Sequence, residues 1–120
     1  MFIGSWCRNA VKLPNRERAI IAPAKLTEYL LNVEHWRGGT KARLLLQFGY
    51  SANNWQQLEA DIRQYHLETD VDVMRVTPYG KRYEISASLQ TPSGESLHFR
   101  TVWQIDRGQD LPRLITLVPD

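Results

Sequence analysis

The chain of 120 residues can form one domain with a substantial core, and its 42% apolar and 23% charged residues are typical of a water-soluble globular protein. No apolar run approaches the roughly 18 residues that a membrane span requires, and the N-terminal residues lack the pattern of a signal peptide. The one cysteine, Cys7, cannot form an internal disulfide, so we expect a reducing, cytoplasmic compartment.

Positive charge is concentrated in the first half of the chain. Residues 1–50 carry eight Lys and Arg against three Glu, a net charge of +5, whereas residues 51–120 carry seven basic against ten acidic residues, a net charge of −3. This asymmetry favours an anionic ligand on the first half. It falls short of the strong basicity that marks a dedicated duplex-DNA binder.

Three helices are predicted in the first half of the single domain that we place at residues 16–120. Residues 1–15 show no periodicity and are expected to form a flexible tail, and residues 16–21 a short extended entry. Pro23 suits a first helical turn, and Leu26, Tyr29 and Leu30 follow with the spacing of one helix face, up to about residue 32. Further helices are expected from about residue 40 to Gly49 and from Ser51 to about residue 66.

The second half alternates apolar and polar residues in the manner of half-buried strands. This alternation runs over residues 68–76, 82–89, 98–105 and 111–118, and turn sequences rich in Pro and Gly separate the segments. Short connections of this kind join antiparallel neighbours. The sequence therefore predicts an α+β fold in which three N-terminal helices pack on a four-strand antiparallel meander.

The stretch from Tyr29 to Arg43 has the densest set of reactive side chains. His35 could act as an acid–base group because imidazole titrates near neutral pH, although a surface histidine is the plainer alternative. Lys41 and Arg43 follow a Gly–Gly pair at a predicted helix start, where free amides and cations suit a phosphate. The string GGTKA lacks P-loop spacing, which excludes an NTPase, and an ordinary capped helix remains an alternative.

The last two predicted strands supply a second group of candidates. Thr101 falls in an otherwise apolar row, where its hydroxyl needs a partner, and Arg113 with Thr116 forms a cation–hydroxyl pair. The alternative for the threonines is β-propensity alone, and for Arg100 and Arg113 a solvated sheet face. His66 is expected to end a helix as an imidazolium that complements the dipole, and His98 to be exposed. No histidines have ligand spacing, so no metal site is predicted.

Several strings of this chain resemble an uncharacterised bacterial domain family whose members occur alone and at the C-terminal ends of secreted polymorphic toxins. The resemblance covers about residues 13–119. It rests on the string YLLN-x-x-H-x-x-G-x-x-KA at residues 29–42 and on later pieces that include TPYG at 77–80, TPSG at 91–94, TVW at 101–103 and PRLIT at 112–116. The ending Leu117-Val118-Pro119 departs from the Ala-Tyr-Pro of the family, and Trp36 stands where the family tends to have proline.

By analogy, the toxin context implies the barnase/colicin/RelE-like class of metal-independent ribonucleases, with no cofactor and with RNA as the substrate. In that reading His35 is the acid–base group, Lys41 and Arg113 hold the phosphate, and Thr101 or Thr116 orients it. Trp36 or Tyr79 would stack a base, and Arg43 and Arg100 would add substrate contacts.

Two other classes of function stay open at the level of sequence. The same residues could shape the surface of a non-catalytic binding or immunity-type module, whose partner would be a protein. An inhibitor or immunity protein is the partner expected for a toxin. The third alternative is a stand-alone protein in which every histidine is structural. The sequence does not predict the oligomeric state.

Overall fold

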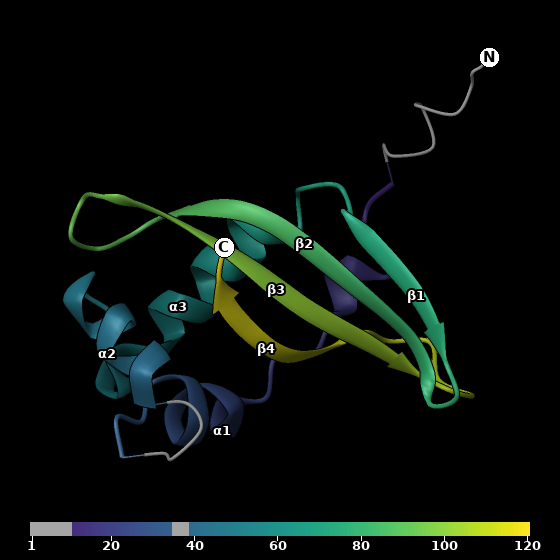
Figure 1. Cartoon of the computed structure of the whole chain (residues 1–120), viewed down its shortest axis with the longest axis horizontal. Helices are drawn as coiled ribbons and strands as arrows, with labels where there is room; N and C mark the ends of the chain where they lie inside the picture. The colour runs from purple at the N-terminus through teal and green to yellow at the C-terminus, as the bar shows by residue number, and fades with distance from the viewer. Residues whose placement is uncertain (1–10, 35–38) are drawn as a thin grey trace.

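The computed structural model describes residues 11–34 and 39–120 and shows helical segments followed by four strands (Figure 1). The helical segments are η2 (Arg16–Arg18), α1 (Pro23–Lys25), η3 (Leu26–Leu30), α2 (Gly39–Gln47), η4 (Ala52–Asn54), α3 (Trp55–Asp61) and η5 (Ile62–His66). The strands are β1 (Val73–Thr77), β2 (Gly80–Gln90), β3 (Ser96–Asp106) and β4 (Arg113–Pro119). The predicted α+β class with a four-strand meander is confirmed, since the sheet order is β1-β2-β3-β4 and every pairing is antiparallel.

The helices begin close to where the sequence predicts, and two of them, α1 and α3, continue into wider, π-helical turns. Pro23 occupies the first turn of α1, which runs without a break into the π-helical segment η3. Ser51 forms a capping box with Asn54 before α3, because the Asn54 side chain accepts hydrogen bonds from the Ser51 backbone and hydroxyl. The helix α3 likewise continues into a π-helical segment, η5, which carries His66 at its end.

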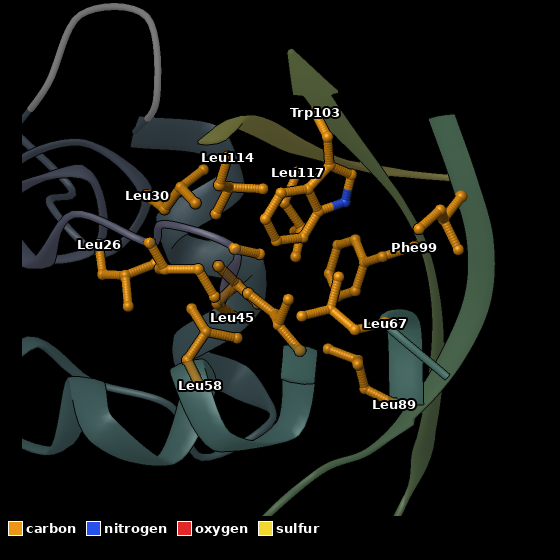
Figure 2. Close-up of a cluster of buried hydrophobic side chains, with 14 of the residues drawn as sticks. Leu26, Leu30, Leu45, Leu58, Leu67, Leu89, Phe99, Trp103, Leu114 and Leu117 are labelled. Carbon is orange, nitrogen blue, oxygen red and sulfur yellow. The ribbon is translucent and has the colours of Figure 1, made fainter. Parts of the chain in front are cut away.

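One face of the sheet packs against the helices and forms the core. Figure 2 shows Phe99 and Trp103 of β3 directed toward leucines of the helices, together with Leu114 and Leu117 of β4. Phe99, Trp103 and Leu117 are fully buried. The alternation of side chains along β3 therefore gives one apolar face and one face directed away from the helices.

Two tight features set the register of the strands. Gly80 has φ +143°, and a Cβ at this position would lie 2.1 Å from the carbonyl oxygen of Ile105, so only glycine fits the β1–β2 turn. In the β3–β4 pair, Trp103 faces Leu114 and Val102 faces Thr116, which leaves Ile115 without an opposite residue as a β-bulge.

Residues 11–15, which the sequence assigned to a flexible tail, belong to the folded domain. Leu13 is 1% exposed within the core, the Lys12 ammonium lies 2.7 Å from a carboxylate oxygen of Asp70, and the Val71 amide donates to the Val11 carbonyl. The domain boundary therefore lies before residue 16, because this segment buries an apolar side chain. Residues 1–10 of the predicted tail lie outside the described residues.

The first and last predicted strands are shorter than expected. Residues 68–72 lie before β1 because the amide and hydroxyl of Thr69 bond to the carbonyls of His66 and Tyr65 at the helix end. The last strand begins at Arg113 instead of Leu111, where its edge pairs with Ile20. In the part of the chain that the structure describes, no helix is long and apolar enough to cross a membrane.

Candidate functional site

Three polar side chains from three elements meet beside the edge strand β4. The Lys41 ammonium on α2 donates to the hydroxyl of Thr116 on β4 at 2.9 Å and to the phenolic oxygen of Tyr29 on η3 at 3.1 Å. The two hydroxyl oxygens are 3.5 Å apart. We call Tyr29, Lys41 and Thr116 the hydroxyl–lysine site. The sequence predicted that Thr101 or Thr116 would meet Lys41, and the structure brings Lys41 and Thr116 together.

The local packing of the helices explains why these groups converge. Leu26 and Leu30 are fully buried, which anchors η3 in the core and leaves Tyr29 partly exposed at its side. The helix α2 begins at Gly39, where a Cβ would lie 2.7 Å from the Val33 carbonyl oxygen. Glycine therefore permits the close return of the chain that places Lys41 opposite Tyr29.

The β-bulge of β4 contributes the third member. Leu114 and Leu117 are buried, and an ideal strand would not place two residues three positions apart on the same face. The extra residue Ile115 restores the inward direction of Leu117 and displaces Thr116 at the strand edge. A β-bulge changes the direction of the side chains next to it. Here the residue after the bulge, Thr116, is the one that contacts Lys41.

The electrostatics of the site favour negative charge. The hydrogen bond with Thr116 lowers the pKa of the Tyr29 phenol, burial opposes this effect, and the nearby ammonium groups of Lys41 and Lys25 lower the pKa further. The Lys25 ammonium lies 5.4 Å from the centre of the Tyr29 ring. Among the described residues, no carboxylate forms an ion pair with Lys41, whose ammonium donates hydrogen bonds to two hydroxyl groups. The site thus combines a cation that no described carboxylate neutralises with a phenol whose pKa is lowered.

Arg113 and Tyr79 lie elsewhere, in an open hollow of about 710 Å³ on the other side of the sheet from the core. The Arg113 guanidinium is held by both carboxylate oxygens of Asp106, at 2.8 and 3.1 Å, which raises the pKa of Arg113. Because of the bulge, Arg113 and Thr116 lie opposite Gln104 and Val102 of β3, roughly 7 Å apart along the strands, and the Arg113 guanidinium is bound by Asp106. Arg113 is therefore not at the hydroxyl–lysine site, although both sites are on the same strand.

Thr101 is a core residue and its hydroxyl is occupied. Its side chain is 0% exposed, its oxygen accepts a hydrogen bond from the Trp103 indole at 2.9 Å, and it lies 2.8 Å from Nδ1 of His66. The sequence-based expectation that this hydroxyl needs a partner is confirmed. The burial of Thr101 separates it from any ligand at Lys41, so Thr116 is the threonine that meets this lysine.

His66 corrects the expectation of a charged histidine at a helix end. It is 0% exposed, and burial lowers its pKa from 6.5 to about 4, so its imidazole is neutral near pH 7. The backbone of Ala87 and Ile85 partly offsets this effect, although Nε2 has no hydrogen bond of standard geometry. The loss of solvent around the ring lowers the pKa of His66 by more than the helix dipole, expected from the sequence, would raise it.

The two other predicted substrate contacts lie apart from Lys41. Arg43 is exposed on α2 two residues beyond Lys41, about 200° further around the helix. Arg100 is surrounded by carboxylates, at 2.9 Å from Asp72, 3.2 Å from Glu84 and 3.6 Å from Asp120. This neutralised environment does not attract a further anion.

His35 and Trp36, the remaining predicted site residues, lie outside the described residues. Tyr29 is the member of the site that sequence reasoning missed as a chemical group. We counted it among the apolar residues of a helix face, because a tyrosine at helical spacing usually packs in the core. The sequence did hold one signal for Tyr29, because it lies twelve residues before Lys41 in the same string of the family resemblance.

One other polar cluster has the residue types of a nucleophilic triad. Ser86, His98 and Asp120 form hydrogen bonds on the exposed side of the sheet, but the serine and the carboxylate both face Nε2 of His98. A nucleophilic triad needs the acid on the opposite nitrogen, which here faces Ser88 at 3.1 Å. Within the described residues, no cluster of His, Cys, Asp and Glu could hold a metal ion. The predicted absence of a metal stays a prediction.

Comparison with known proteins identifies the family. Residues 12–120 match the model of a domain of unknown function, DUF6883. The chain belongs to this family. A chain of a solved structure described as "Contact-dependent growth inhibition toxin - immunity protein complex from Klebsiella pneumoniae 342" is similar to the DUF6883 chain, with a TM-score of 0.66 and 15% identity. The match covers 85% of this chain and 100% of the other. At this identity the likeness shows a shared fold. No curated protein matches the DUF6883 chain.

Proposed function

We propose that this protein is a toxin-type endoribonuclease that works without a metal ion and uses the hydroxyl–lysine site. The observation that carries the proposal is the position of the Lys41 ammonium, 2.9 Å from the Thr116 hydroxyl and 3.1 Å from the Tyr29 phenol, without a carboxylate partner among the described residues. A phosphate is the ligand that such a group of donors favours. The fold shared with a chain of a toxin–immunity complex adds support.

The proposed reaction is transesterification of RNA. The ribose 2′-oxygen attacks its own phosphorus, a new O–P bond forms, and the bond from phosphorus to the 5′-oxygen of the next nucleotide breaks. Lys41 stabilises the extra negative charge of the phosphorane, and Thr116 orients a non-bridging oxygen. Tyr29, whose pKa is lowered, donates its proton to the leaving 5′-oxygen. His35, assigned from sequence, removes the proton of the 2′-hydroxyl.

Incubation of the purified protein with RNA in EDTA tests this proposal. The expected products have a 2′,3′-cyclic phosphate and a free 5′-hydroxyl, because no water enters the first step. His35→Ala should abolish cleavage, and cleavage at the wild-type rate by this variant would remove His35 from the mechanism. Thr116→Val keeps the shape of the side chain and removes its hydroxyl, so it should slow cleavage without unfolding the protein. If the wild-type protein left the RNA intact, the proposed ribonuclease activity would be refuted.

A second candidate function is a non-catalytic immunity-type module. The specific observation in its favour is that the similar solved chain comes from a structure described as a complex of a toxin with its immunity protein. Expression in bacteria separates the two functions. A toxin should arrest growth, and Lys41→Gln should relieve the arrest. Growth at the normal rate with high yield of the wild-type protein, combined with intact RNA in the assay above, would favour the immunity-type module.

A further inference from the structure

Three arginines and a glutamine form one row across the sheet on the face opposite the core. The strand register pairs Arg75 with Arg82, Arg82 with Gln104, and Gln104 with Arg113, so the row crosses β1, β2, β3 and β4 (Figure 1). Their chain neighbours Tyr83 and Trp103 are buried, and successive strand residues point to opposite faces. We call these four residues the arginine row. Neighbouring members are about 4.8 Å apart in the backbone.

The arginine row concentrates positive charge, and the groups around it neutralise only part of that charge. Like charges directly opposite each other, as in Arg75 and Arg82, destabilise a sheet. The Arg82 guanidinium donates to the Gln104 side-chain oxygen at 3.1 Å, but its buried Nε has no hydrogen-bond partner. Asp106 is the one carboxylate among the residues that line the hollow, and it pairs with Arg113. A bound anion would therefore offset an existing repulsion.

An exposed aromatic ring borders the same hollow. Tyr79, in the β1–β2 turn, is 75% exposed, and its backbone is fixed on both sides. The Tyr79 amide donates to the Thr77 hydroxyl at 3.2 Å, and the Tyr79 carbonyl accepts from the Arg107 amide at 2.8 Å. Pro78 and Ile115 add apolar surface beside it. An exposed ring on an anchored backbone, next to several guanidinium groups, matches the chemistry that stacks a base while its phosphate is bound.

We infer that the arginine row and Tyr79 bind a segment of single-stranded RNA adjacent to the cleaved bond. The inference rests on the proposed function and names its substrate class. The arginines bind phosphates, and Tyr79 stacks an unpaired base, which a duplex would keep within its own stack. Arg113 and Thr116 lie opposite Gln104 and Val102 of β3, roughly 7 Å apart, so an RNA strand can run from the hollow to Lys41. The hollow thus selects unpaired RNA for the hydroxyl–lysine site.

Binding is measured apart from cleavage with a fluorescein-labelled 2′-O-methyl oligoribonucleotide of mixed sequence, which lacks the nucleophilic hydroxyl. Fluorescence anisotropy of the full chain gives the dissociation constant over a range of salt concentrations. Tyr79→Ala should weaken binding roughly 5- to 100-fold, and Tyr79→Phe should retain it, because stacking needs the ring and not the hydroxyl. Arg113→Ala should weaken binding and reduce the slope of log K against log salt by about 0.7.

Two further variants test the direction in which the affinity for RNA changes. Asp106→Asn removes the one carboxylate of the hollow and releases Arg113, so it should tighten binding, by up to about fivefold. Lys81→Ala is the matched control, because Lys81 precedes Arg82 on β2, is exposed, and points to the opposite face. It should leave the dissociation constant unchanged. Thermal unfolding of each variant reports whether it remains folded.

The outcomes separate this inference from the proposed function. If folded Tyr79→Ala and Arg113→Ala proteins bound the oligonucleotide with wild-type affinity, the inference that this surface binds RNA would be overturned, even if the protein cleaves RNA through Lys41. Binding that depends on Tyr79 and Arg113 in a protein that cleaves no RNA would support the surface and refute the nuclease. Absence of oligonucleotide binding by the wild-type protein at low salt would overturn the inference and leave an acidic protein as the partner of the arginine row.

Discussion

Lowering the pH should destabilise the fold through His66, well before most carboxylates titrate. The His66 ring is 0% exposed and lies on the core side of the sheet. Its Nδ1 is 2.8 Å from the hydroxyl oxygen of Thr101. The Thr101 oxygen already accepts the indole hydrogen of Trp103, so its own hydrogen is available to Nδ1 of a neutral imidazole. Protonation of His66 would place an unpaired charge in the core.

The magnitude follows from the difference in pKa between the two states of the chain. The pKa of His66 is 6.5 in the unfolded chain and about 4 in the folded protein. Between these values the unfolded chain binds more protons, so the free energy of unfolding decreases as the pH falls. Linkage gives a loss of roughly 2 kcal/mol between pH 7 and pH 5, and about 3 kcal/mol when titration is complete. Total stabilities are typically about 5–15 kcal/mol.

Urea denaturation followed by tryptophan fluorescence at several pH values between 7 and 5 measures this effect. His66→Gln should remove most of the pH dependence in this interval. His98→Gln is the comparison, because it removes an exposed histidine and leaves the burial of His66, the main cause of its lowered pKa, in place, so most of the dependence should remain. A wild-type free energy of unfolding that stays constant from pH 7 to pH 5 would refute the reasoning, as would equal pH dependence in wild type and folded His66→Gln protein.

Three further predictions concern single contacts. Tyr50→Phe removes the phenol that donates to the buried Asp61 carboxylate at 2.5 Å, and should lower the free energy of unfolding by about 1–3 kcal/mol in urea titrations; an unchanged value would contradict this. Gly80→Ala should cost more than about 2 kcal/mol, and clearly more than Gly94→Ala, whose Cβ meets nothing within 4 Å; equal costs would refute the steric argument. Lys41→Ala should raise the pKa of Tyr29 toward its ordinary value, and NMR titration of ¹³C-labelled tyrosines would contradict the assigned electrostatics if that pKa did not move.

Local signals in the sequence predicted the elements well because those elements are determined by their own residues. Pro23 and the Ser51 cap fixed two helix starts, and the TPYG turn fixed the β1–β2 hairpin. The alternation of residues 68–72 was misleading because strand pairing depends on a partner. Main-chain pairing with β2 extends only to Asp72, whose amide donates to the Glu84 carbonyl, and the preceding residues complete the end of a helix. Burial of Leu13 is likewise a long-range contact without a periodic signal.

The candidate site was predictable in part. The sequence proposed Lys41 as a phosphate ligand, which stays a prediction, and Thr116 was one of two threonines proposed to meet it. The choice between them depends on strand face, since Thr101 alternates with Phe99 and Trp103 and is therefore inward, where His66 satisfies it. The bulge at Ile115, which displaces Thr116, and the Asp106 carboxylate, which holds Arg113, come from pairing between distant residues.

The rate of RNA cleavage by Lys41→Gln protein in EDTA is the most direct test of the central claim, that the hydroxyl–lysine site performs the reaction. Single-turnover rates at saturating RNA should fall by about 10²–10³-fold, as expected when one preorganised donor to a developing oxyanion is lost. Lys81→Ala, which removes a positive charge away from the site, should cleave at the wild-type rate. A folded Lys41→Gln protein that cleaves RNA as fast as wild type would contradict the account.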